Sequence, residues 1–177
     1  MKKIIWLLPG ILYPYCMLLF LYGIFTGHAD DFFPSITIID ILLCLGALFL
    51  IAAIGNIIFI ARHLAGKYRA ADLPFINLLV KLIHIPAYLL IFALGILCMI
   101  TIFTMGFSLF FVFFDCLTIC LSGMTGLLTV WTLCHGGKCT KQFMILHGLL
   151  QFIFVADVIS AVIIYRRAKN CSSENCL

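Results

Sequence analysis

Charged residues are scarce in this sequence. Only 10% of its 177 residues are Asp, Glu, Lys or Arg, whereas 65% are hydrophobic. Soluble domains carry about 25% charged and about 45–50% apolar residues. A water-soluble fold of this length has too little interior to bury so much apolar surface. The composition therefore excludes an ordinary soluble domain and makes lipid the expected solvent for most of the chain.

The sequence also lacks the alternation of apolar and polar residues that marks membrane β-strands. Its apolar runs are continuous, and in hydrocarbon such runs must form helices to satisfy their own backbone hydrogen bonds. We therefore predict an all-α, polytopic bundle of transmembrane helices, built as a single integral membrane domain over residues 1–177. About five spans are expected, near residues 4–26, 36–61, 85–105, 109–133 and 143–165.

The start of the chain has a second interpretation. Lys2 and Lys3 precede the first apolar run, and Gly27-His28-Ala29 resembles the cleavage site of a signal peptide. Cleavage would leave four spans. The apolar run is long for a signal peptide, which favours a retained helix.

Lys and Arg in the short loops predict a cytoplasmic N-terminus. With five spans, however, the basic tail that follows Tyr165 falls on the outside and violates the rule. A count of four or six spans would return this tail to the cytoplasm.

Motifs of enzymes and of cofactor-binding proteins are missing. The sequence has no H-E-x-x-H, G-x-S-x-G, phosphate-binding loop or dinucleotide fingerprint. Cys134, His135 and Cys139 lack a fourth ligand for zinc, while Cys171 and Cys176 could form a disulfide if oxidised. We expect no catalytic residue, metal, cofactor or nucleic-acid partner. The expected partners are the lipid bilayer and either other membrane subunits or further copies of the chain.

Three acidic residues lie inside the expected spans, namely Asp40, Asp115 and Asp157. Intramembrane carboxylates are costly and often functional. The five-span map places all three in the same half of the bilayer, so they form a candidate ion or proton site. The alternative is that each carboxylate reaches the interface or bonds a neighbouring helix on its own.

Small and hydroxyl residues form a stripe along the expected fourth span. Helical spacing places them within about 120° of one another, and such residues let membrane helices pack closely and bond across the interface. We interpret the stripe as a polar helix seam, and a hydrophilic path is the alternative. Its members beside Asp115 are Thr118, Ser122, Thr125, Gly126 and Thr129.

A second polar face precedes the expected third span. Asn77, Lys81, His84 and Tyr88 follow spacings of four, three and four residues, so they share one helix face. Lys81 and His84 are candidate contacts for an anionic lipid headgroup. The alternative is a helix that enters through the interface with this face in water.

Several phrases in the second half resemble a known family. They are residues 81–88, KLIHIPAY; 114–116, FDC; 122–126, SGMTG; and 151–160, QFIFVADVIS. The chain resembles small, uncharacterised multipass membrane proteins of Gram-positive gut bacteria. The resemblance implies a bacterial plasma membrane and no known function, so it adds no site residue.

The sequence thus favours an integral membrane protein that acts as a non-enzymatic accessory or interaction module. The alternative is a small oligomeric transporter or ion-conducting unit that uses the intramembrane aspartates. A membrane enzyme acting on lipids or thiols ranks last.

Overall fold

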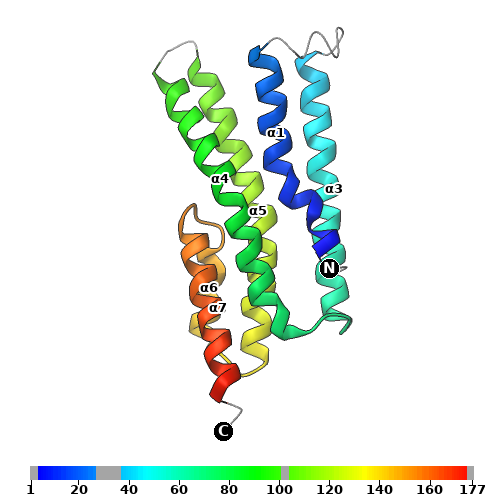
Figure 1. Cartoon of the computed structure of the whole chain (residues 1–177), viewed down its shortest axis with the longest axis vertical. Helices are drawn as coiled ribbons and strands as arrows, with labels where there is room; N and C mark the ends of the chain where they lie inside the picture. The colour runs from blue at the N-terminus through cyan, green and yellow to red at the C-terminus, as the bar shows by residue number, and fades with distance from the viewer. Residues whose placement is uncertain (1–3, 27–36, 101–103, 175–177) are drawn as a thin grey trace.

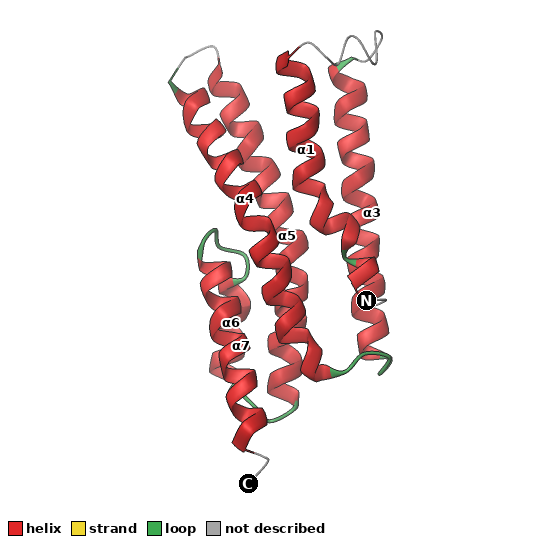
Figure 2. Cartoon of the chain, viewed as in Figure 1, coloured by secondary structure: helices red, strands yellow, loops and turns green. Residues whose placement is uncertain are grey.

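The computed structural model describes residues 4–26, 37–100 and 104–174, and every regular element in these ranges is a helix (Figures 1 and 2). The predicted all-α bundle is therefore confirmed. In chain order, its elements are η1 (Ile4–Trp6), α1 (Leu8–Thr26), α3 (Ile38–Leu64), η2 (Ala70–Asp72), α4 (Leu73–Met99), α5 (Met105–His135), α6 (Lys141–Leu150) and α7 (Ala156–Glu174).

Four helical segments are long and apolar enough to cross a membrane. They are Ile4–Gly23, Ile39–Leu64, Ala70–Met99 and Met105–His135. Three of them lie close to the predicted spans. The third differs, because α4 begins at Leu73 rather than near residue 85. The half-apolar segment before residue 85 forms the first turns of this helix instead of a separate interfacial segment.

The expected fifth span is not a single helix. α6 ends at Leu150, the chain reverses over residues 151–155, and α7 begins at Ala156. The two helices lie side by side and reach along only part of the bundle (Figure 1). Arg167 Nε donates a hydrogen bond to the carbonyl of Lys138, 3.3 Å away, so α7 returns to the loop from which α6 started. The structure therefore has two helices joined as a hairpin, not one continuous helix, over 143–165.

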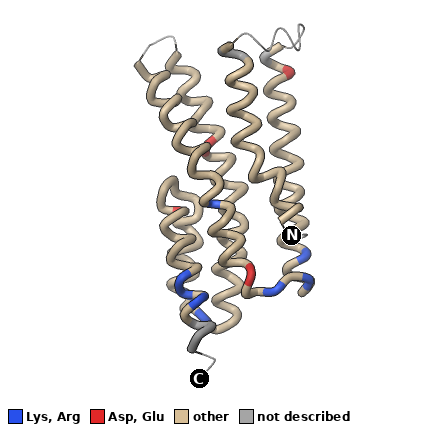
Figure 3. Tube along the Cα trace, viewed as in Figure 1, with Lys and Arg blue, Asp and Glu red and all other residues tan. Residues whose placement is uncertain are grey.

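This hairpin brings the basic tail to the same end of the bundle as the other basic loops, hereafter the basic end (Figure 3). The α3–α4 connection, the α5–α6 connection and the C-terminal half of α7 all lie there. The conflict between the tail and the charge rule, expected for a tail at the opposite end, does not arise in this arrangement. The Lys and Arg residues of this end are Arg62, Lys67, Arg69, Lys138, Lys141, Arg166, Arg167 and Lys169.

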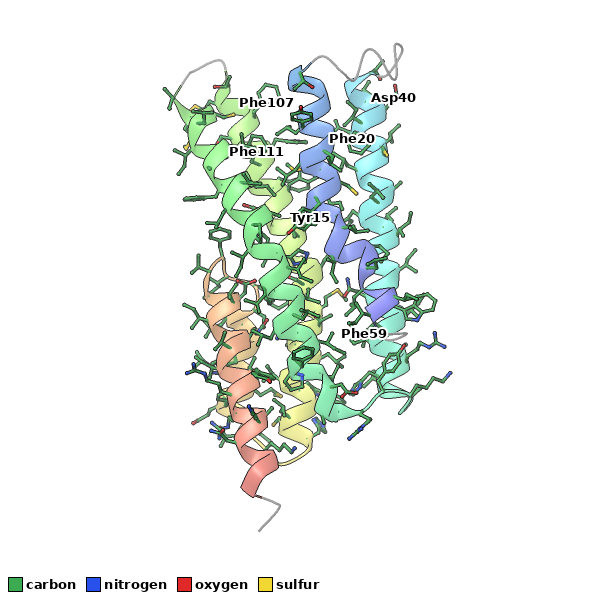
Figure 4. The ribbon with its side chains drawn as sticks, in the orientation of Figure 1. Tyr15, Phe20, Asp40, Phe59, Phe107 and Phe111 are labelled. Atoms are coloured by element: carbon green, nitrogen blue, oxygen red, sulfur yellow. The ribbon has the colours of Figure 1, made fainter. Side chains whose placement is uncertain are left out.

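Two side-chain hydrogen bonds connect α1 with α4. Pro14 has no N–H, so the carbonyl of Gly10, four residues earlier, loses its helical donor. His84 Nε2 lies 3.3 Å from this carbonyl oxygen and therefore carries the donated proton. In the opposite direction, the hydroxyl of Tyr15 donates to the carbonyl of Ile83 (Figure 4). The proline break in α1 is thus compensated by α4.

Gly55 marks the closest approach between α3 and the N-terminal segment. A Cβ at this position would lie 2.3 Å from the carbonyl oxygen of Trp6. Both atoms belong to rigid backbone elements, so neither moves easily to relieve such a contact.

We predict that Gly55→Ala lowers stability by about 1–3 kcal/mol, because it overpacks this contact. The midpoint of thermal unfolding in detergent micelles measures the effect. Gly46→Ala, on the same helix, is the control, because no atom lies within 4 Å of its added Cβ. The control should be neutral or stabilising by up to about 1 kcal/mol, since Ala favours helix over Gly. A Gly55→Ala protein as stable as the control would contradict the close approach.

Candidate functional site

The polar face of α4 points into the bundle. The exposed fractions of Asn77, Lys81, His84 and Tyr88 are 0, 0, 1 and 4%, whereas Leu82 between them is exposed. Lys81 and His84 therefore do not reach the surface where lipid headgroups would lie, and the expected headgroup role does not hold. The reason is the early start of α4, which places about two helical turns between Lys81 and the basic end.

Lys81 forms an ion pair with Asp157 in the interior. Its Nζ lies 2.8 Å from Asp157 Oδ2, and both side chains are completely buried. The same Nζ donates to Ser122 Oγ at 3.0 Å and to the carbonyl oxygen of Gln151 at 3.3 Å. An ammonium group has three protons to donate. All of them therefore have acceptors, one each from α5, the α6–α7 linker and α7.

Asp157 lies in the first turn of α7. Its second oxygen, Oδ1, accepts a hydrogen bond of 2.8 Å from the backbone N–H of Val158. A carboxylate is favoured at a helix N-terminus because the exposed N–H groups carry partial positive charge. The start of α7 and the ammonium of Lys81 thus stabilise the same negative charge.

The linker between α6 and α7 is held in a conformation that its residues do not prefer. Val155 has a φ of 66°, which is unusual for a β-branched residue. Lys81 bonds the carbonyl of Gln151 at the start of the linker, and Tyr88 packs edge-on against Phe154 with ring centroids 5.7 Å apart. Contacts with α4 therefore determine where the hairpin turns.

Two glycines of α5 make room for this linker. A Cβ at Gly126 would lie 2.2 Å from Gln151 Oε1, and a Cβ at Gly123 would lie 2.7 Å from the ring of Phe152. The rest of the predicted seam is also buried. Its hydroxyl members are Thr118, Ser122, Thr125 and Thr129, with exposed fractions of 1, 3, 2 and 1%. Each of these hydroxyls donates to a backbone carbonyl three or four residues earlier in α5.

A second polar cluster joins α6 to α7. The Ser160 hydroxyl donates to the carbonyl of His147 at 3.3 Å. It accepts from Gln151 Nε2 at 3.1 Å and lies 2.9 Å from His147 Nδ1. The Ser160 hydroxyl can donate its single proton to only one of these two groups of His147 at a time. These bonds fasten the two arms of the hairpin to each other, independently of α4.

Some buried polar atoms in the described residues have no hydrogen-bond partner. They include both side-chain polar atoms of Asn77, Nδ1 of His84, Oδ1 of Asn56 and Oδ1 of Asp115. Asn56 and His84 border a small cavity that Ser122 also lines. Its volume is about 10 Å³, which holds about one water molecule. The polar core has room for a bridging water here and not for a substrate.

The three predicted aspartates do not meet. Asp40 is exposed at the far end of α3, where its Oδ2 accepts hydrogen bonds from Thr37 N at 2.9 Å and from Thr37 Oγ1 at 2.7 Å (Figure 4). This is a helix cap. Asp115 is half-buried on α5, and Asp157 is paired with Lys81. No three His, Cys, Asp or Glu residues are placed to hold a metal ion within the described ranges.

The partner of Asp157 was missed because Lys81 was expected near the membrane surface. The signal was present in the sequence. A lysine in the middle of a long helix requires a counter-ion, and Lys81 lies eight residues after the start of α4. Gln151 and Ser160 were also missed as a pair, since their contact depends on the turn between them.

Comparisons with known proteins identify a family but no activity. The model of a family of unknown function, DUF6652, matches residues 3–170. Neither the curated proteins nor the solved structures contain a significant match.

The ion pair predicts a characteristic set of stabilities. Lys81→Met or Asp157→Leu alone leaves a buried unpaired charge and should cost about 3–5 kcal/mol, whereas the double variant should recover most of the loss. Unfolding in detergent, followed by circular dichroism, measures all three. Lys169→Met, the same change at an exposed site, should alter stability by less than about 0.5 kcal/mol. Additive losses in the double variant would contradict a direct pairing.

Proposed function

Because the chain belongs to the DUF6652 family, whose function is unknown, we propose its role from its geometry. We propose that it is a multi-pass protein of the bacterial plasma membrane that serves as a non-enzymatic accessory or interaction module. The bilayer is its immediate partner, and other membrane subunits or further copies of the chain are its protein partners. The observation that carries the proposal is the complete enclosure of the Lys81–Asp157 ion pair.

A transporter or an enzyme needs its charged groups within reach of a substrate. Here Lys81 has all its protons committed to acceptors, and Asp157 uses both oxygens within the fold. The neighbouring cavity of about 10 Å³ admits a water molecule and nothing larger. The charges thus serve to fix the hairpin against α4 and α5, which supports a structural role for the polar interior.

The charge distribution supports an orientation. Cytoplasmic loops of membrane proteins carry an excess of Lys and Arg, so the basic end lies in the cytoplasm in this proposal. α1 runs antiparallel to α3, which ends at the basic end, so the chain also starts on that side (Figure 1). An N-terminus and a C-terminal tail that are both cytoplasmic follow from four spans and a hairpin.

A second candidate function is a small ion- or proton-conducting unit, and one observation favours it. Oδ1 of Asp115 is buried without a hydrogen-bond partner, and intramembrane carboxylates are common in proton relays. The hydroxyl oxygens of Tyr88 and Ser122 lie 3.4 Å apart, and Lys81 donates to Ser122. These two hydroxyls would be the first steps of a proton path that ends at Lys81. The conducting unit requires the Lys81–Asp157 ion pair to separate, whereas the accessory role does not.

Flux measurements separate the two candidates. For the accessory role, proteoliposomes with the wild-type chain should conduct protons and monovalent cations no faster than protein-free liposomes, because the interior has no open path. Asp115→Asn should give the same background. A wild-type flux that Asp115→Asn abolishes, with folding retained, would replace the accessory role by the conducting unit.

Reporter fusions test the orientation. A fluorescent protein attached after the last residue should fluoresce, and alkaline phosphatase at the same point should be inactive, because the tail is cytoplasmic. Fusions made after Thr104, at the opposite end of the bundle, should show the reverse pattern. An active phosphatase at the C-terminus, with the pattern after Thr104 unchanged, would mean that residues 143–165 cross the membrane, whereas a reversal at both points would mean the opposite orientation.

A further inference from the structure

An apolar groove runs along the outside of the bundle between α3, α5 and α6. Its volume is about 630 Å³, and it lies in the half of the bundle that ends at the basic end. Aliphatic and aromatic side chains form its walls, without a charged residue among them. The lining that matters here is Ile60 and Leu64 of α3, Leu127 and Trp131 of α5, and Ile145 and Leu149 of α6.

Each wall continues into a basic residue at the basic end. On α6, Lys141 lies one turn before Ile145 on the same helix face and is exposed. On α5, the exposed His135 follows Trp131 by one turn, and the two rings lie 4.2 Å apart. The exposed Lys67 follows the last residues of α3. On each of the three helices, a basic residue thus lies within about one turn of a lining residue, toward the basic end; these three residues, Lys67, His135 and Lys141, are called the rim.

We propose that this groove binds one acyl chain of an anionic phospholipid, with the headgroup held at the rim by Lys67, Lys141 and His135. The proposal rests on the membrane placement given above and adds a specific ligand to it. A groove without polar lining residues cannot orient a polar ligand, but an acyl chain needs no hydrogen bonds. Basic residues between helices on the cytoplasmic side are suited to acidic headgroups.

The position of Trp131 in the groove provides a direct probe. The chain has two tryptophans, Trp6 and Trp131. Trp6 stacks against Arg62 at 5.3 Å, and Trp6→Phe keeps an aromatic ring there. The full-length Trp6→Phe protein is reconstituted into phosphatidylcholine vesicles, and brominated phosphatidylglycerol or brominated phosphatidylcholine replaces a fixed small fraction of the lipid. Bromine quenches Trp131 only when a brominated chain lies beside it.

Brominated phosphatidylglycerol should quench Trp131 at lower mole fractions than brominated phosphatidylcholine. Each lysine near an anionic surface contributes a factor of about five in binding, so Lys67→Gln and Lys141→Gln should each weaken the preference by about that factor. Arg166→Gln removes a charge from the basic end but not from the rim, and it should leave the preference unchanged.

Other outcomes overturn the proposal in different ways. Equal quenching by the two lipids would leave the membrane placement intact and remove the anionic site. If Lys141→Gln and Arg166→Gln weakened the preference for phosphatidylglycerol equally, the anionic lipid would be attracted by the basic end as a whole and not by a site. No quenching by either lipid, in protein that floats with the vesicles, would mean that a second copy or a partner helix covers the groove. Protein that fails to float with the vesicles would overturn the membrane placement itself.

Discussion

A lysine ammonium and an aspartate carboxylate enclosed among apolar helices constrain most of this fold. Removing two charges from water costs several kcal/mol for each ion unless geometry and further hydrogen bonds compensate. The compensation here comes from three places at once: the hydroxyl of Ser122, the carbonyl of Gln151 and the start of α7, where the backbone N–H of Val158 donates to Asp157. Meeting all these conditions together fixes the position of the hairpin relative to α4 and α5.

The glycines and the unusual backbone of the linker follow from the same requirement. The linker lies close to α5 where Lys81 reaches both the carbonyl of Gln151 and the carboxylate of Asp157. A Cβ at position 123 or 126 would force the side chain of Phe152 or Gln151 to move. The left-handed conformation of Val155 costs energy locally. Contacts with α4 and α5 hold part of this linker, namely Gln151, Phe152 and Phe154, whereas Val155 itself is exposed.

Sequence alone predicted the helical class and most helix positions, because continuous apolar runs leave few options. The hairpin escaped prediction for a physical reason. Residues 143–165 are as long as a span and contain no proline, and their break depends on contacts with α4 that no local pattern encodes. Asp157 was placed at a depth similar to that of Asp40 and Asp115 only because this segment was assumed to cross. Once it turns back, Asp157 belongs with Lys81, while Asp40 is left as a helix cap. The seam of α5 was visible in advance because helical spacing alone defines a face.

The separation of the ion pair along the chain has a consequence for biogenesis. Lys81 and Asp157 are 76 positions apart, so α4 leaves the ribosome long before its counter-ion is synthesised. During that interval an uncompensated cation occupies a helix that is otherwise suited to hydrocarbon. α7, which is made later than α4, therefore supplies the charge that neutralises Lys81. A polypeptide cut short before α7 would keep the buried ammonium of Lys81 without its carboxylate.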